Sequence, residues 1–436
     1  MALTGRAALV ALAGVVPIVL APSGLTVLAW VLLLAVLVGV DLALAGSPRA
    51  LRLDREPLPT VRLGEQVTAA LVVGNAGRRG VRGLLRDGWS PSTGDTVRRH
   101  RLHVPAGQQR RVVTTLRPTR RGDRRTDRVT VRSLGPLGVA ARQVSLPAPG
   151  VLRVLPAFAA RRHLPGKLAR LRELDGLVSA AVRGQGTEFD SLRDYVEGDD
   201  VRSIDWRATA RRHAGQATVS PVVRTWRPER DRRLLLVLDP SRTAAARVGD
   251  APRLDAAMDA ALLLAALAAR AGDRVDLLAM DRRVRARVEG VGRSSLLPAL
   301  VSAMAPLEAD LVEADWTALS GAVLRQLSRR ALVVLLTTVD SAAVADELLP
   351  VLPLLTARHQ VVVASVTDPT VDALARGRGD AYAVYGAAAA ERALLERTAV
   401  TAELERVGVE VVEGSPEQLP PRLADRYLAL KAAGRL

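Results

Sequence analysis

Apolar and polar positions beyond residue 219 alternate between short apolar runs and longer Ala/Leu-rich stretches. Residues 234–238 form a continuous apolar run, which is typical of a strand buried on both faces of a sheet. Residues 254–270 have the composition of a helix, and Gly272 follows as a stop signal. The same alternation predicts further strands at 274–280, 331–336, 360–366 and 409–412, and helices at 296–304, 317–328, 343–356 and 421–433. Strands and helices in this order predict an α/β domain with a doubly wound parallel sheet.

Residues 49–155 have a different pattern. Short apolar runs of strand length are separated by Gly, Pro and Asn, and helical periodicity is absent. The clearest runs are 67–73, 111–116, 128–131 and 151–155. Strands at this spacing predict a small β-sandwich, which we interpret as a spacer.

The N-terminal 48 residues are strongly apolar, and no charged residue occurs between Ala7 and Val40. Pro17 and the turn-like sequence at 22–24 divide the run into two segments. The second segment, 25–44, has about the 20 residues that a membrane-spanning helix needs, whereas the first, 7–21, is shorter. We therefore predict a transmembrane helical hairpin over residues 1–48, with Asp41 near the end of its second helix.

Arginines flank this apolar segment on both sides. Arg6 precedes it and Arg49, Arg52 and Arg55 follow it, so the positive-inside rule places both termini in the cytoplasm and the protein in the plasma membrane. A signal peptide cleaved near Ala21 is the competing interpretation and would export the remainder. A second apolar span directly after that position argues against cleavage.

The composition narrows the possible chemistry. The chain has no Cys, which excludes disulfides, thiolate catalysis and Cys-ligated metals. The net charge of +17 comes almost wholly from Arg, because Lys167 and Lys431 are the only lysines. Aromatic residues make up 3% of the chain, which leaves few rings for base stacking. We therefore expect this positive charge to interact with membrane lipid and not with nucleic acid.

Oxygen-bearing side chains follow the first predicted strand of the α/β domain. Asp239, Ser241 and Thr243 lie at alternate positions, and Thr317 and Asp340 follow at other strand ends. Ligands of doubly wound sheets bind at the carboxyl ends of the strands, and hard oxygen donors suit Mg²⁺. These five residues are candidate metal ligands. The alternative is that both aspartates cap the helices after their strands while the hydroxyls satisfy loop backbone.

The most polar motif, residues 184–211, interleaves acids and arginines with three of the few aromatic residues. Such a mixture suits either a packed structural clasp or a docking surface. The candidate partner-binding residues are Phe189, Arg193, Tyr195, Gly198, Asp199, Asp200, Arg202, Asp205, Trp206 and Arg211.

Catalytic motifs are missing from the sequence. There is no G-x-x-x-x-G-K-[ST], no H-E-x-x-H and no G-x-S-x-G, and no nucleophile or His accompanies the carboxylates of the polar motif. We expect a protein that is not an enzyme. A hydrolase that uses Asp199 or Asp205 is the competing hypothesis.

The run F-D-S-L-R-D-Y-V-E-G-D-D-V-R-S-I-D-W-R at 189–207 closely resembles the signature of the domain of unknown function 58 family. Four shorter motifs resemble the family too: Arg120-Arg121-Gly122, Pro136-Leu137-Gly138, Arg358-His359 and Asp368-Pro369. The resemblance implies paired membrane helices, a β-rich segment and a von Willebrand factor A-like domain, here assigned to 1–48, 49–155 and 233–436, with the signature segment at 156–232.

The resemblance also implies a partner, a MoxR-type AAA+ ATPase, and a metal-ion-dependent adhesion site. The sequence departs from the ideal site in two places: Thr243 replaces a Ser, and Thr338 stands where the family often has Asp, with Asp340 two residues later. These departures weaken the expected Mg²⁺ site.

These patterns together predict a membrane-anchored, non-enzymatic scaffold or adaptor that binds a MoxR-type ATPase or its client through the von Willebrand factor A-like domain. An outward-facing, metal-dependent adhesion protein and a purely structural membrane protein are the alternatives.

Overall fold

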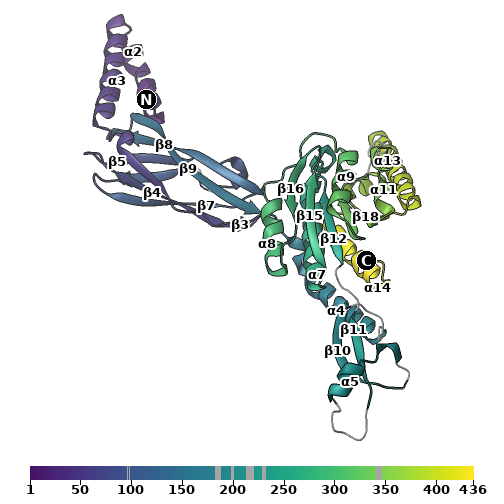
Figure 1. Cartoon of the computed structure of the whole chain (residues 1–436). Helices are drawn as coiled ribbons and strands as arrows, with labels where there is room; N and C mark the ends of the chain where they lie inside the picture. The colour runs from purple at the N-terminus through teal and green to yellow at the C-terminus, as the bar shows by residue number, and fades with distance from the viewer. Residues whose placement is uncertain are drawn as a thin grey trace. The chain divides into compact units, whose positions relative to one another are not determined.

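The computed structural model describes residues 1–95, 97, 99–181, 188–197, 201–212, 220–227, 232–339 and 346–436 (Figure 1). It divides into two compact units, an N-terminal unit, Met1–Ala157, and a C-terminal unit, Phe158–Leu436. Each is described by itself.

The apolar N-terminus of the first unit is helical. It forms α1 (Gly5–Ala13), α2 (Val15–Leu20) and α3 (Gly24–Leu44). Within the described ranges, one helix, Gly24–Ala50, is long and apolar enough to cross a membrane. The first predicted span is instead divided into two short helices at Gly14.

Helices α1 and α3 are in contact through one aromatic side chain. The indole N–H of Trp30 on α3 donates to the carbonyl of Val10 on α1, at 3.2 Å. A Cβ at Gly14 would meet the Trp30 ring at 2.1 Å, so the absence of a side chain there makes room for the indole. The two apolar segments are therefore in contact at this point.

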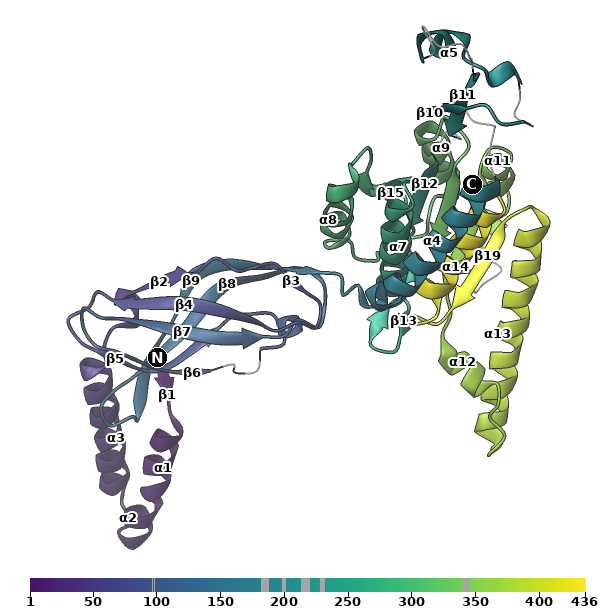
Figure 2. The same ribbon diagram turned by 90° about the horizontal axis from the view of Figure 1, so that it is seen from below.

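The rest of the N-terminal unit is a sandwich of two largely antiparallel sheets (Figure 2). The first has the order β1-β9-β8-β5-β6 with β3 beside β9, and the second has the order β2-β4-β7. The strands of the first sheet are β1 (Ala2–Leu3), β3 (Val61–Arg62), β5 (Val81–Asp87), β6 (His100–Val104), β8 (Gly122–Leu134) and β9 (Ala140–Leu155). Those of the second are β2 (Leu51–Arg55), β4 (Val67–Asn75) and β7 (Gln109–Leu116). Alternate apolar residues of both sheets share one core, among them Leu71, Val73 and Val112 from the second sheet and Val81, Leu85 and Val131 from the first.

Asp41 joins α3 to this sandwich. Its carboxylate is fully buried and accepts hydrogen bonds from three backbone N–H groups: those of Leu137 (2.8 Å) and Val139 (2.5 Å) in the turn between β8 and β9, and that of Ala140 (2.9 Å), where β9 begins. The hydroxyl of Thr4, just before α1, donates to the carbonyl of Gly138 at 2.6 Å. Both ends of the apolar segment are thus bonded to the Pro136-Leu137-Gly138 motif.

The C-terminal unit is a mixed α/β domain around a six-stranded sheet of order β16-β15-β12-β17-β18-β19. Its strands are β12 (Arg233–Leu238), β15 (Arg274–Met280), β16 (Val284–Val288), β17 (Leu332–Leu336), β18 (Gln360–Val366) and β19 (Glu410–Gly414). All neighbouring pairs are parallel except β15 and β16. The edge strand β16 is absent from the sequence prediction.

Helices cover this sheet. Helices α4 (Leu164–Ala181), α7 (Arg253–Arg270) and α14 (Leu419–Ala432) contact one another and lie side by side (Figure 2). Helices α9 (Trp316–Gln326), α11 (Leu352–Thr356) and α13 (Ala381–Arg406) contribute buried residues to a core with Leu235 and Val237 of β12. The remaining helices of the domain include α6 (Arg242–Ala245), α8 (Arg293–Met304) and α12 (Pro369–Leu374).

Candidate functional site

The carboxylate of Asp239 lies where β12 ends, against the end of the neighbouring strand β17. Oδ1 accepts from the backbone N–H of Ser241 at 3.0 Å, and Oδ2 accepts from the hydroxyl of Thr337 at 2.6 Å. Asp239 is 2% exposed and Thr337 is buried as well. The parallel pairing of β12 with β17 brings these residues together, because adjacent parallel strands end at the same edge of a sheet.

Burial raises the pKa of Asp239 above the ordinary value of a carboxyl group. The hydrogen bonds from Thr337 and Ser241 oppose this shift, while the negative charge of Asp281 adds to it. The ionised carboxylate is therefore disfavoured at this position, and a bound cation would offset that cost.

Asp239, Ser241 and Thr243 line a small pocket of about 100 Å³ together with Glu313 and Glu347. The hydroxyls of Ser241 and Thr243 lie 3.3 Å apart. One carboxylate and two hydroxyls form the hard oxygen set that Mg²⁺ prefers. Among the residues that the structure describes, however, no three His, Asp or Glu side chains come together as they would around a metal ion.

One of the five predicted ligands is not part of this arrangement, and another is not described. Thr317 is exposed on the first turn of α9 and does not line the pocket. Asp340 lies outside the described residues. The residue that contacts Asp239 from β17 is Thr337, which the sequence analysis did not select. Position along the strand was the available signal, because Thr337 is the first residue after β17.

Arg242 does not neutralise Asp239. Its Nε donates to Glu313 Oε1 at 2.8 Å, and both side chains are about half exposed. The guanidinium is therefore held at the rim of the pocket by its own carboxylate partner.

A second buried carboxylate, Asp281, lies at the end of β15. It accepts from the N–H of Arg283 at 3.0 Å and from Nη1 of Arg285 at 2.7 Å, and Arg285 also bonds Asp310. Burial alone would raise the pKa of Asp281, but these hydrogen bonds and the charge of Arg285 outweigh burial and hold it below the usual value. The ends of β12, β15 and β17 thus form one polar edge of the sheet.

The signature segment forms a small folded element in the C-terminal unit. Strand β10 (Glu188–Asp194) pairs antiparallel with β11 (Val222–Arg227), and the helices η4 (Val201–Ser203) and α5 (Trp206–Arg212), which lie between these strands in the chain, both contact β11. Asp205 caps α5, because its Oδ1 accepts from the N–H groups of Arg207 and Ala208, both at 3.0 Å.

Asp205 also pairs with Arg224 on β11, at 2.7 Å from Nε. The hydrogen bond from Ala208, followed by that from Arg224, lowers the pKa of Asp205. Thr209 adds a further link by accepting from the N–H of Val222 at 2.9 Å. These bonds form a clasp between α5 and β11.

The other predicted partner-binding residues are distributed over this element. Arg193 on β10 donates to the carbonyl of Asp194, and the N–H of Tyr195 donates to the carbonyl of Pro221. Arg202 lies in η4, and Arg211 donates to the carbonyl of Arg207. The side chain of Phe189 and all of Gly198, Asp199 and Asp200 lie outside the described residues.

Trp206 presents an aromatic side chain to solvent. It is 67% exposed although it begins α5. An exposed indole on a clasped element is typical of an interface anchor. The element is thus a packed clasp with an exposed indole, and its use as a docking surface stays a prediction.

The curated relatives of this chain include two mycobacterial proteins. The uncharacterized protein Rv1480 of Mycobacterium tuberculosis is 29% identical over 206 residues, which is 45% of this chain and 62% of the relative. The uncharacterized protein Mb1516 of Mycobacterium bovis matches with the same values. The match thus spans less than two thirds of the length of these relatives.

Solved structures also resemble parts of the chain. The hypothetical protein BatB from Bacteroides thetaiotaomicron covers 47% of this chain and 99% of its own, with 15% identity and a TM-score of 0.30. The SpRpn10 VWA domain covers 46% of this chain and 94% of its own, with 12% identity and a TM-score of 0.26.

A family model described as "Protein of unknown function DUF58" matches residues 191–408, which is half of the chain. The match includes most of the signature segment, the Asp239 edge and the Asp368-Pro369 motif. The chain therefore belongs to the DUF58 family.

Proposed function

We propose that this protein is a membrane-anchored, non-enzymatic scaffold that binds a MoxR-type AAA+ ATPase or its client through the C-terminal unit. The observation that carries the proposal is the polar edge at the ends of β12, β15 and β17, where the Asp239 pocket opens beside Glu313 and Glu347. Ligands of parallel sheets bind at this edge. The family resemblance supplies the nature of the partner.

The order of the sheet supports the finer fold assignment. Strand β12 is central, β15 lies on one side of it and β17 on the other, and helices pack on the sheet. We therefore assign a doubly wound, von Willebrand factor A-like sheet, in which the Asp239 edge lies where the strand order reverses.

Mg²⁺ at this edge is part of the proposal. Asp239, Ser241 and Thr243 would hold the ion, and its charge would offset the cost of the buried carboxylate. The ion would join the pocket to a carboxylate of the partner, so that metal and partner bind together.

We further propose that α3 anchors the protein in the plasma membrane with both termini in the cytoplasm. The apolar helix and the flanking arginines support this orientation. An AAA+ ATPase of the cytoplasm could then reach the C-terminal unit.

Co-purification in mild detergent tests the scaffold proposal. The full chain should enrich an AAA+ ATPase over an unrelated membrane bait, and Trp206→Ala should reduce the recovered ATPase severalfold. Tyr382→Ala is the control, because Tyr382 is also an exposed aromatic residue and lies far along the chain on α13. Equal recovery of the ATPase with the unrelated bait would refute the proposal.

A further inference from the structure

The outer face of the first sheet of the sandwich carries a group of arginines, which we call the arginine face. It consists of Arg82, Arg86, Arg101, Arg125, Arg128 and Arg132, from strands β5, β6 and β8. Their neighbours Val81, Leu85 and Leu102 are buried in the core. Because side chains alternate along a strand, the arginines lie on the solvent side of the sheet.

The strand register brings these arginines next to one another. Leu84 on β5 lies opposite Arg101 on β6 and Arg132 on β8, and Arg86 lies opposite Thr130. A bulge between Thr126 and Arg128 inserts one extra residue into β8. The bulge keeps both Arg125 and Arg128 on the outer face, which strict alternation would not allow.

Most of these guanidinium groups form no ion pair within the described part of the chain. Arg82, Arg86, Arg101 and Arg128 make no side-chain hydrogen bond or ion pair with any residue in the described ranges. Arg132 bonds only the neutral side chain of Gln143.

Other arginines of the sandwich are paired. Arg55 bonds Asp87, Arg111 bonds Glu56 and Arg153 bonds Asp123. Arginines elsewhere in this unit thus have carboxylate partners. The arginine face, by contrast, has an excess of positive charge.

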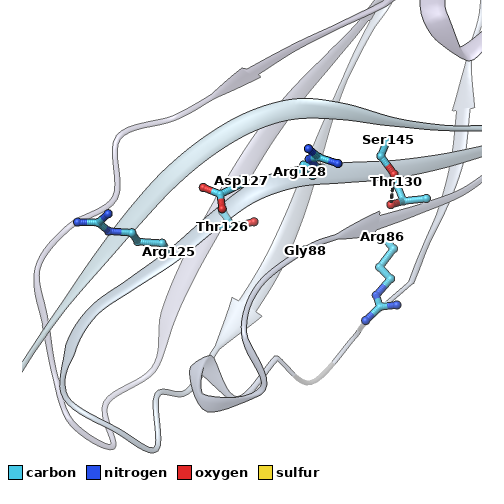
Figure 3. A pocket seen from close by; sticks show the side chains of 8 residues that line it. All are labelled: Arg86, Gly88, Arg125, Thr126, Asp127, Arg128, Thr130 and Ser145. Atoms are coloured by element: carbon cyan, nitrogen blue, oxygen red, sulfur yellow. Dashed lines mark hydrogen bonds between the residues drawn. The ribbon is translucent and has the colours of Figure 1, made fainter. Parts of the chain in front are cut away.

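A hollow of about 520 Å³ lies within this face (Figure 3). Arg86, Arg125 and Arg128 line it together with Asp127, Thr130 and Ser145, and Thr130 and Ser145 bond each other at 3.0 Å. Figure 3 shows the three arginines spread around the hollow and not aimed at one point. This spacing suits an extended chain with several negative charges better than a compact anion such as phosphate.

We propose that the arginine face is a docking surface for an acidic segment of a partner protein. Unpaired guanidinium groups recognise carboxylates through charge-assisted, often bidentate hydrogen bonds. Strands β5, β6, β8 and β9 contain no Phe, Tyr or Trp, so this face offers a nucleic-acid base little to stack on besides the imidazole of His103. The surface belongs to the N-terminal unit and is separate from the Asp239 edge.

Fluorescence anisotropy tests the proposal with the full chain in nanodiscs of zwitterionic lipid. The probe is a labelled peptide of about fifteen glutamates. Two exposed arginines that each pair with a glutamate together contribute about tenfold to the binding affinity. The Arg86→Gln/Arg128→Gln variant should therefore bind about tenfold more weakly than wild type, and added salt should weaken wild-type binding.

The matched control is Arg52→Gln/Arg110→Gln, which removes the same charge from exposed positions on the second sheet. It should change the affinity less than about twofold, and thermal unfolding should show that both variants are folded. An equal loss in both variants would overturn the proposal, since it would reflect net charge alone. Tighter binding of a single-stranded oligonucleotide, or of phosphatidylglycerol vesicles, than of the peptide would overturn it in favour of that ligand. These outcomes concern the arginine face alone. They leave the co-purification test of the C-terminal unit unchanged.

Discussion

Two buried carboxylates, Asp239 and Asp281, have different surroundings, and these shift their pKa values in opposite directions. Asp281 has a guanidinium partner and a pKa below the usual value, whereas Asp239 has only hydroxyl and amide donors and a raised pKa. The two lie at the ends of neighbouring strands. Asp239 is therefore the carboxylate on which an added cation would have the larger effect.

Asp239→Asn tests this difference. A raised pKa means that the folded protein holds the proton more tightly than the unfolded chain, so wild-type stability falls as pH rises from about 3.9 through the raised pKa. The Asp239→Asn variant cannot ionise at this position, so its stability does not fall with pH in this way. Without Mg²⁺ it should have the higher unfolding temperature at pH 7, and the difference should vanish near pH 3.

The same thermal unfolding measurement, repeated with Mg²⁺, tests the metal site. Mg²⁺ should raise the unfolding temperature of the wild type and leave that of Asp239→Asn unchanged. Asp310→Asn serves as the control, because Asp310 is a half-exposed carboxylate paired with Arg285 and does not line the pocket. Equal responses of all three proteins to Mg²⁺ would remove the ion from the proposed function.

At the scale of elements, the junction between α3 and the sandwich depends on polar contacts. Asp41 accepts three backbone hydrogen bonds, and a Cβ at Gly135 would meet its carboxylate at 2.3 Å. The Pro136-Leu137-Gly138 motif is thereby given a physical role, because its turn presents N–H groups to the end of an apolar helix. These bonds connect the helix and the sandwich within one compact unit.

Asp41→Ala should loosen this junction. Leaving three buried N–H groups unpaired costs about 3 kcal/mol or more, which corresponds to about a hundredfold faster amide exchange if the turn opens locally. Hydrogen exchange of the full chain in detergent, followed at residues 135–140, measures the effect. Asp54→Ala on the exposed side of β2 should leave exchange there unchanged. Similar exchange in both variants would show that Asp41 does not hold the turn.

At the scale of the molecule, the N-terminus belongs to the fold of its unit. Residues Ala2 and Leu3 pair with β9, Thr4 bonds Gly138, and Arg6 donates to the carbonyl of Leu137. A cleavage near Ala21 would remove all of these contacts. We therefore expect the first apolar segment to be retained.

Intact-mass measurement of the protein purified from membranes checks this retention. The mass should include residues 2–21, since their loss would expose the end of β9 and the turn after β8. Protease added to whole cells should leave the C-terminal unit intact before lysis, as a cytoplasmic orientation requires. A mass that begins after Ala21, or cleavage without lysis, would instead favour the exported, adhesion-type alternative.

Apolar runs in the sequence match some elements of the C-terminal unit and not others. Strands β12, β15 and β18 agree closely with their apolar runs, because strands buried on both faces must be apolar throughout. The polar edge strand β16 has no such run, and the 26-residue helix α13 is so rich in Ala that its apolar side is indistinct. Both form because neighbouring elements complete their hydrogen bonds or cover part of their surface.

Local pattern alone determined the apolar N-terminal helix, the change from strand-rich to alternating composition, and the family signature, because hydrophobic periodicity and residue order are properties of neighbouring positions. Only the tertiary structure decided that Thr337 bonds Asp239, that Asp41 binds the turn after β8, and that six arginines share one face of a sheet. Each of these depends on strand register or on contacts between residues far apart in the chain, which a linear pattern does not encode.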